Sequence, residues 1–380
     1  MIDKVASVAS VPGGHRPRRP PRHRAWPGAA RDRARGRPRR RATGDRRGHP
    51  RLRDDMSTTP DLLQYRRGLH DLGSGCFAWL LPDGSWGWSN SGLITGSGTS
   101  LMVDTLFDLA LTGEMLEGIR PVTDRHPLQT LVNTHSDGDH VFGNQLLAER
   151  DVEIIASEAT AELITQDQVD ALASVRRRSG PIGEFTRHAF GPFVFDGIVA
   201  TGPDRTFTGQ ESLDVGGREV RLIQVGPAHT PGDTLVHVPD ARLLYAGDIL
   251  FIGGTPVVWA GPTSRWIAAC DLILDMDVVT IVPGHGPATD KSGVGPVRDY
   301  LQFVLDEATK RYEDGLGVEE AVASIDLGRF AGLPEHGRLA QNVLNVYQEL
   351  DPAVPRPSRY DVLGRIAALE GFGTGEEESR

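Results

Sequence analysis

One short segment of the chain is dense in side chains that bind metal ions. Residues 133–140 read NTHSDGDH, and His135, Asp137, Asp139 and His140 all carry metal-binding atoms. Imidazole and carboxylate suit Zn, Fe or Mn, and a carboxylate can also bridge two ions. Adjacent Asp139 and His140 can serve one ion while His135 serves another, which favours a site with two ions. Alone, however, the segment is equally typical of a solvated acidic turn.

Three further residues with metal-binding side chains each follow an apolar run. His229 ends VRLIQVGPAH, Asp248 follows RLLYAG, and His285 follows VVTIVPG, just as residues 133–140 follow LQTLV. Loops at the ends of strands let side chains converge on a ligand while the strands hold them in place. The sequence therefore predicts a metal site assembled from four strand ends.

The elements that must position these residues alternate between β and α. Residues 76–105 contain short β-like runs separated by DGS and GSG, which is typical of an antiparallel meander. Further strands are expected over LQTLVNTH, VEIIAS, the Gly-Gly hairpin of residues 207–226, TLVHVPDARLLYAGD and VVTIVPGHG. Helical spacing appears at 106–119, 158–176, 264–276 and from about 294 to 350. Two comparable β-rich halves predict two sheets packed face to face, with helices outside.

The order of the motifs resembles the metallo-β-lactamase superfamily. His-x-x-x-Asp-His, AHTPGDT, YAGD and PGHG follow one another over approximately residues 76–290, and SLMVDT supplies Asp104 at the end of an early strand. The resemblance implies an α/β, four-layer αβ/βα sandwich with the metals at one edge, here followed by a helical C-terminal extension. It also implies a division of ligands: His135 and His229 on a first ion, Asp139, His140 and His285 on a second, and Asp248 bridging.

The chain departs from the commonest pattern of this family, His-x-His-x-Asp-His, because residue 137 is an aspartate. In one interpretation Asp137 is itself a ligand, and the oxygen-rich first site suits Fe or Mn better than Zn. In a second, Asp137 is too short to reach, and one Zn held by Asp139, His140 and His285 does the work. In a third the metal site is lost and the fold is a binding module. We favour the first, since an acid in a ligand position still binds metal.

The expected activity follows from the metal. A bound ion lowers the pKa of water from about 15.7 towards 7, and the resulting hydroxide attacks an ester, thioester, lactone or amide carbonyl of a small molecule. Asp139 is expected to hold and orient this nucleophile. We expect two zinc ions, with Fe or Mn as alternatives because of Asp137, and no other cofactor. The alternative function is a di-iron oxidoreductase or oxygenase on the same fold.

Other residues near the ligands have less specific signals. Asn133, Ser136 and Thr230 are expected either to orient the imidazoles or simply to form turn hydrogen bonds, and Asp233 is expected to form hydrogen bonds within its loop rather than bind metal. Residues 176–204 look irregular and are interpreted as a lid or as an exposed insertion. Trp259 and Trp266 are expected to line the entrance of the pocket, with packing in the core as the alternative for each.

Charge divides the chain into two unequal parts. Residues 1–55 hold 17 Lys and Arg against 5 Asp and Glu, a net charge of +12, while the rest holds 24 against 46, a net charge of −22. The composition of the basic arm, residues 1–55, predicts disorder. In a second interpretation translation starts at Met56, and the arm is no part of the true protein. The expected organisation is the arm at 1–55, a metal-binding domain at 56–293, a helical extension at 294–371 and a disordered tail at 372–380.

Composition also bears on partners and location. No run of eighteen apolar residues occurs in the sequence, so no membrane-spanning helix is expected. The arm lacks the apolar region of a secretory signal, which favours a cytoplasmic location. The negative charge of residues 56–380 argues against nucleic acid as a partner. We therefore expect a small-molecule substrate, no membrane partner and, as an option, a homo-oligomer.

Overall fold

The computed structural model describes residues 65–373. All of these residues belong to the unit Ser57–Arg380, and the other unit of the chain, Met1–Met56, lies outside the described residues. The predicted disorder of the arm at 1–55 and of most of the tail at 372–380 therefore falls outside them too. The domain boundaries proposed from the sequence stay a prediction.

The first sheet contains seven strands that lie side by side in chain order. They are β1 (Gly68–Asp71), β2 (Cys76–Leu80), β3 (Ser91–Gly96), β4 (Thr99–Val103), β5 (Leu128–Val132), β6 (Glu153–Ser157) and β7 (Arg205–Phe207). Strands β1 to β4 are antiparallel, which confirms the predicted meander, and β4 to β7 are parallel. Because β4, β5 and β6 run parallel, the residues after them reach the same edge of the sheet.

The second sheet has five strands in the order β12-β11-β10-β9-β8. They are β8 (Gln210–Val215), β9 (Arg218–Gln224), β10 (Thr234–Val238), β11 (Leu243–Phe251) and β12 (Thr280–His285). Strands β8 and β9 form the predicted hairpin, in which Gly216 and Gly217 both adopt positive φ, as a two-residue hairpin turn requires. Strands β11 and β12 are parallel, so their carboxyl ends also lie together.

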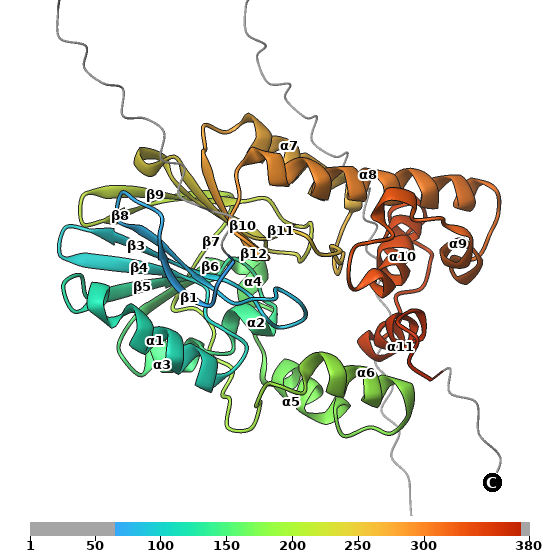
Figure 1. Ribbon diagram of the computed structural model, residues 1–380, viewed down its shortest axis with the longest axis horizontal. Helices are drawn as coiled ribbons and strands as arrows, with labels where there is room; N and C mark the ends of the chain where they lie inside the picture. Colours follow the sequence, from blue (N-terminus) through green and yellow to red (C-terminus); the bar gives the residue numbers. More distant parts are fainter. Residues whose placement is uncertain (1–64, 374–380) are drawn as a thin grey trace, which may run out of the picture. The chain divides into compact units, whose positions relative to one another are not determined.

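Apolar side chains from both sheets pack into one central core, which includes Val103, Val132, Leu222 and Tyr245. Helix α1 (Leu109–Thr123) covers the outer face of the first sheet, and α7 (Thr263–Asp275) and α8 (Lys291–Glu313) cover that of the second (Figure 1). The expected order of helix, sheet, sheet and helix is confirmed.

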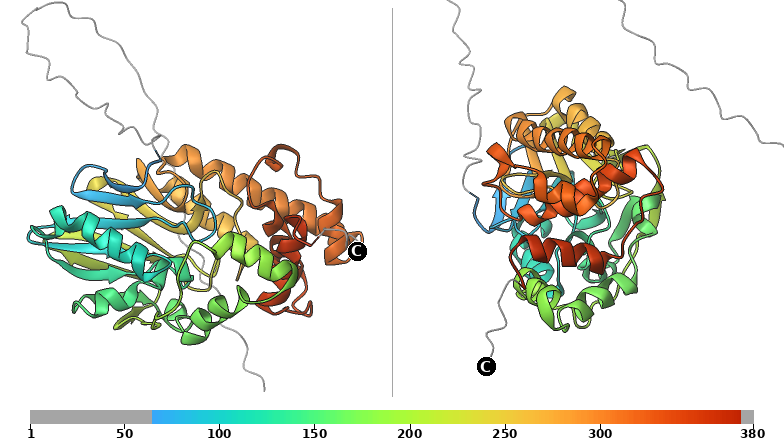
Figure 2. Two further views of the ribbon diagram at one scale, coloured as in Figure 1. Left: turned by 60° about the horizontal axis from the view of Figure 1, so that its bottom comes forward. Right: turned by 90° about the vertical axis from the view of Figure 1, so that its right-hand side faces the viewer.

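Along the chain, the remaining helices come between the strands or after the last strand. They are α2 (Gly138–Val141), α3 (Asn144–Ala148), α4 (Glu158–Ala161), α5 (Gln166–Val175), α6 (Gly180–Phe190), α9 (Val318–Ser324), α10 (Leu339–Leu350) and α11 (Arg359–Leu369), with short 3-10 turns at Pro239–Ala241, Gly328–Phe330 and His336–Arg338. Helix α11 packs against α6, although the two lie far apart in the chain (Figure 2, right).

Several sequence-based expectations about helices need correction. The helix expected at 158–176 is divided into α4 and α5, and the helical stretch expected from about 294 to 350 is divided into α8, α9 and α10. Residues 176–204 are not irregular throughout, because α6 occupies 180–190 and buries Phe185 and Phe190. The helix expected at 106–119 begins only at Leu109, where the Asp108 side chain caps its first turn by accepting from Leu111 N.

No helix within residues 65–373 is both long enough and apolar enough to cross a membrane.

Candidate metal centre

The seven predicted metal ligands lie at or near the ends of four strands. His135, Asp137, Asp139 and His140 follow β5, and the other three, His229, Asp248 and His285, come from the loop before β10, from within β11 and from the end of β12. Asp137 is the N-cap residue of α2, yet its side chain makes no capping hydrogen bond. Its carboxylate therefore stays free to face the other ligands.

The Asp248 carboxylate lies at the centre of the four imidazoles. Its Oδ1 is 3.1 Å from His140 Nε2, and its Oδ2 is 3.4 Å from both His229 Nε2 and His285 Nε2 and 3.7 Å from His135 Nε2. A single carboxylate that reaches the rings on both sides has the geometry of a bridging ligand.

The other two carboxylates lie on opposite sides of this centre. Asp137 Oδ2 is 3.2 Å from His229 Nε2, and Asp139 Oδ2 is 3.2 Å from His285 Nε2. Three overlapping groups could each hold a metal ion: His135, Asp137 and His229; His135, His140 and Asp248; and Asp139, His140 and His285. The structure thus places Asp137 where the first interpretation needs it, and its role as a ligand stays a prediction.

The donor atoms fit a metal ion because the outer nitrogen of every ring is already held. His229 Nδ1 donates to Val257 O at 2.7 Å and His285 Nδ1 donates to Gly84 O at 3.0 Å. A ring that donates from Nδ1 presents the lone pair of Nε2 to a metal. Among the described residues, the inward atoms His135 Nε2, His140 Nε2 and Asp248 Oδ1 are buried without a hydrogen-bond partner.

Asp104 and Thr134 hold the other two rings. Asp104 Oδ2 accepts from His140 Nδ1 at 3.0 Å and from Thr134 Oγ1 at 2.7 Å, and Thr134 Oγ1 lies 2.9 Å from His135 Nδ1. One carboxylate therefore orients His140 directly and His135 through a hydroxyl. The place of Asp104 after a strand made it a candidate from sequence, whereas no sequence signal pointed to Thr134.

The charges of the cluster shift its pKa values in opposite directions. Burial and the neighbouring His140 lower the pKa of His135 to about 4. Burial opposes the charged forms of His229 and His285, but Asp137 and Asp248 outweigh it at His229, and Asp248 and Asp139 outweigh it at His285, raising each pKa to about 9. Three ionised carboxylates thus attract positive charge into this buried site.

The residues proposed to orient the imidazoles do something else. Asn133 donates to the main-chain oxygen of His140 at 3.2 Å, and Thr230 donates to Asp233 at 2.6 Å. Ser136 is buried, and its main-chain oxygen accepts from Gln168. Asp233 forms hydrogen bonds within its own loop, as expected, and belongs to none of the three candidate metal groups.

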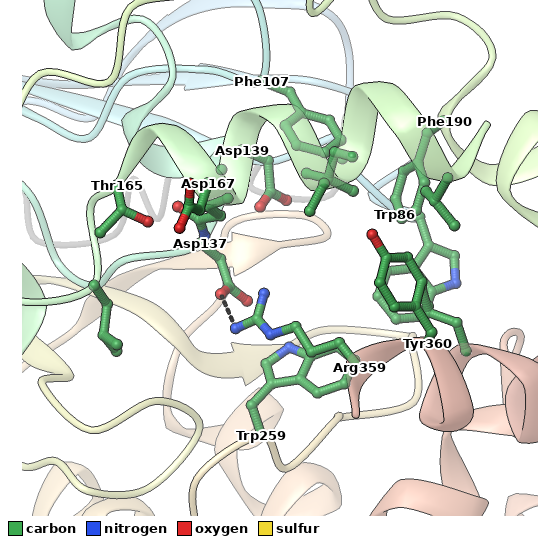
Figure 3. Close-up of a pocket in the computed structure, with 18 of the residues that line it drawn as sticks. Trp86, Phe107, Asp137, Asp139, Thr165, Asp167, Phe190, Trp259, Arg359 and Tyr360 are labelled. Atoms are coloured by element: carbon green, nitrogen blue, oxygen red, sulfur yellow. Dashed lines mark ion pairs between the residues drawn. The ribbon is translucent and has the colours of Figure 1, made fainter. Parts of the chain in front are cut away.

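A pocket of about 440 Å³ opens beside the centre, and Asp137 and Asp139 form part of its wall. Most of the wall is apolar and comes from segments far apart in the chain: Trp86, Phe107, Leu163, Leu172, Val175, Phe190, Trp259 and Leu363. Figure 3 shows the acids towards one end of the pocket and the rings of Trp86, Phe190 and Tyr360 towards the other.

Several pocket residues agree with or depart from the sequence-based expectations. Trp259 lines the pocket as expected, but Trp266 does not, because it is fully buried and donates from its indole nitrogen to Ile249 O. The C-terminal extension contributes Arg359 and Tyr360, which the sequence did not single out. Nothing in their local sequence marks them, since only the packing of α11 brings them to the site.

Comparison with known proteins places this geometry in context. Residues 84–285 match the sequence model of the Metallo-beta-lactamase superfamily. The chain is 28% identical over 300 residues to the 2,4-dinitroanisole O-demethylase subunit alpha of Nocardioides sp. (strain JS1661), covering 77% of this chain and 75% of that protein. It is 22% identical over 305 residues to the alkyl/aryl-sulfatase BDS1 of Saccharomyces cerevisiae, covering 69% of this chain and 46% of the sulfatase.

A solved structure with a similar fold is the stereoselective inverting sec-alkylsulfatase Pisa1 from Pseudomonas sp. The TM-score is 0.59 at 17% identity, and the match covers 77% of this chain and 52% of that one. This chain therefore spans about half the length of the two sulfatases, and the structural likeness is one of fold.

Proposed function

Since the chain belongs to the metallo-β-lactamase superfamily, we propose that it is a metal-dependent hydrolase that cleaves an ester, thioester, lactone or amide bond of a small molecule. We propose two ions, zinc in the first instance. The observation that carries the proposal is the convergence of four imidazole Nε2 atoms on Asp248, beside a pocket of small-molecule size.

The proposed reaction requires the ions only to activate water. When bound, such an ion lowers the pKa of water from about 15.7 to about 7 and so supplies hydroxide at neutral pH. In hydrolysis the oxygen of water bonds to the carbonyl carbon, the bond from that carbon to the leaving group breaks, and the leaving group takes a proton. No further reactant is needed.

The residues of the chain contribute position and exclusion of water. Asp139 lies on the pocket wall and close to His285, so its carboxylate is placed to hold and orient the nucleophilic water. The apolar wall surrounds the body of the substrate and removes water from around the reacting bond. A dry site strengthens the electrostatic stabilisation of the transition state.

The bond attacked is not fixed by the ligand set. The similar proteins are named as an O-demethylase subunit and as sulfatases, so their names describe different bonds. The wall beside the two acids is mostly apolar and has room for a small organic body, and we propose that the reacting group of that body is a carbonyl.

An iron-dependent oxidoreductase is the second candidate, and one observation favours it. Asp137 lies in the first candidate group with His135 and His229, which makes that group richer in oxygen than a site of three histidines. Two histidines and one carboxylate are also the ligand set of non-haem iron oxygenases, and carboxylates suit manganese.

Metal analysis joined to an ester assay tests the proposal. Protein purified without added metal is analysed for Zn, Fe and Mn, and its turnover of phenyl acetate, phenyl thioacetate and a δ-lactone is measured before chelation, after it and after zinc is restored. We expect zinc, loss of turnover on chelation and recovery with zinc. Iron with an optical or paramagnetic signal, and no turnover of the three substrates, would instead favour the oxidoreductase.

A matched pair of histidine variants completes this test. His285→Gln removes a proposed ligand and is expected to lower turnover roughly a hundredfold or more, since even partners behind the ligands contribute 10- to 100-fold. His237→Gln changes a histidine in β10 that belongs to no candidate metal group, and it should leave turnover unchanged.

A further inference from the structure

We propose that Arg359 selects substrates that carry a carboxylate, so that the natural substrate is a small anionic ester with an aromatic or bulky apolar body. This inference rests on the proposed hydrolase function and adds the class of substrate. It concerns the residues of the pocket wall rather than the metal ligands.

Arg359 is the cationic side chain on the pocket wall among the described residues. The wall also carries the acids Asp137, Asp139 and Asp167. Two of these acids belong to the candidate metal groups, so bound ions would offset their charge. Arg359 then remains as the positive charge on the wall, together with the exposed Asp167.

The guanidinium of Arg359 is only loosely held. It lies 4.0 Å from Asp137 Oδ1, and its Cζ is 5.6 Å from the centre of the Trp259 ring. The side chain is 63% exposed, and within residues 65–373 it donates no hydrogen bond. All of its N–H groups are therefore available to a ligand, unlike those of Arg338, which is buried and paired with Glu335.

A carboxylate is the group that matches this geometry. The planar guanidinium fork forms two parallel hydrogen bonds with a carboxylate. In the proposed reaction the carbonyl itself carries no charge before attack, so an anion that Arg359 recognises must be a separate group of the substrate. Arg359 and the acids line the same pocket, so a carboxylate bound by Arg359 and a carbonyl held at the candidate metal groups can belong to one small substrate.

The opposite end of the pocket is suited to an apolar ring. The ring centres of Trp86 and Phe190 are 5.9 Å apart, those of Phe107 and Phe190 are 5.7 Å apart, and those of Trp86 and Trp259 are 6.3 Å apart. Figure 3 shows the Arg359 guanidinium beside Asp137 and the Trp259 ring, away from Trp86 and Phe190. An aromatic ester with one carboxylate satisfies both parts of the wall.

Two esters of equal size test the inference. 4-Acetoxybenzoate carries a carboxylate, and 4-acetoxybenzamide replaces it with a neutral amide. The kcat/KM values of both are measured for zinc-loaded wild type, Arg359→Gln and Arg359→Lys. Binding of the products, 4-hydroxybenzoate and 4-hydroxybenzamide, is measured by titration calorimetry, and the metal content of every variant is determined.

We expect Arg359→Gln to lower kcat/KM for 4-acetoxybenzoate roughly 10- to 100-fold, because a hydrogen bond to a charged group is lost. The kcat/KM for 4-acetoxybenzamide should change little. Affinity for 4-hydroxybenzoate should fall by a similar factor, and Arg359→Lys should retain part of the preference. Arg356→Gln is the control, because it removes the same charge from an exposed position that precedes α11 and is not on the pocket wall.

Equal losses for both esters in Arg359→Gln would overturn the inference, since Arg359 would then only offset the charge of Asp137. If wild type hydrolyses neither these two esters nor phenyl acetate, phenyl thioacetate and the δ-lactone, the proposed hydrolase function fails, and the measured affinities for the two products still decide about Arg359. Equal affinity of wild type for the two products would then overturn the inference on its own.

Discussion

At the scale of single residues, the sequence predicted the candidate metal ligands but not all of the residues that orient them. Motif order and strand ends pointed to all seven side chains of the cluster, which are Asp248 and the six around it. Thr134 carried no signal, because its role depends on where the His135 ring points in the folded chain. Gly138 is also explained only by packing: a Cβ there would lie 2.6 Å from the Phe142 ring.

Removing the Thr134 hydroxyl should weaken metal binding. Thr134→Val keeps the size of the side chain but leaves His135 Nδ1 without its partner. We expect the metal affinity, measured by competition with a chelator, to fall about 10- to 100-fold. Ser100→Ala, which deletes a buried hydroxyl that donates to His126 O, should leave the affinity unchanged. Equal effects of the two variants would show that Thr134 has no specific role.

Chelated protein should lose stability as pH rises. His229 and His285 have pKa values raised to about 9, above the value of about 6.5 expected for the unfolded chain. Their contribution is therefore fully present below pH 6.5 and is lost as pH rises through 9. We expect a loss on the order of a few kcal/mol between these limits, measured by thermal unfolding. Metal-loaded protein should lack this decline, because its ligating imidazoles are neutral; the same decline in both forms would contradict the account.

At the scale of elements, periodicity located most strands and helices, since alternating and helical patterns reflect which face is buried. It missed α6, although Phe185 and Phe190 are buried and Arg187 and His188 are exposed as in an amphipathic helix, because Gly180, Pro181 and Gly183 at the start of the segment are typical of a loop. The sequence also did not predict how the C-terminal helices are joined to the rest of the fold. Arg338 makes it by donating to Thr255 O at 2.6 Å while its Cζ lies 3.8 Å from the Trp86 ring centre.

Arg338→Met should strongly destabilise the fold. The variant leaves Glu335 in a mostly buried position without its partner at 2.8 Å. Removing one member of a buried ion pair costs about 3–5 kcal/mol, which denaturant unfolding measures. Arg329→Met breaks an exposed ion pair with Asp299 and should cost less than about 1 kcal/mol. A cost for Arg338→Met no larger than that of the control would argue against this connection.

At the scale of the whole molecule, the pocket is the feature that the sequence could least predict. Its wall combines residues near 86, 107, 137, 170, 190, 259 and 360, so it exists only after α5, α6 and α11 have packed together. The motifs located the metal centre because four ligands follow β5 and the other three lie in or next to strands of the second sheet. The substrate-facing residues have no comparable local marker.

Deleting residues 1–55 should leave metal content and ester turnover within about twofold of the full chain. The pocket wall and all seven proposed ligands lie within residues 86–363, and long-range attraction between the arm and the rest of the chain is screened at physiological salt. The two proteins are compared at equal metal loading. A large loss of turnover on deletion would show that the arm takes part in the activity.

The most direct test of the account counts metal ions in wild type, Asp137→Ala and Asp137→His. If Asp137 completes the first group with His135 and His229, wild type and Asp137→His hold two ions per chain and Asp137→Ala holds about one, because occupancy depends on the number of ligands. Equal metal content in all three proteins would contradict the assignment of Asp137 as a ligand.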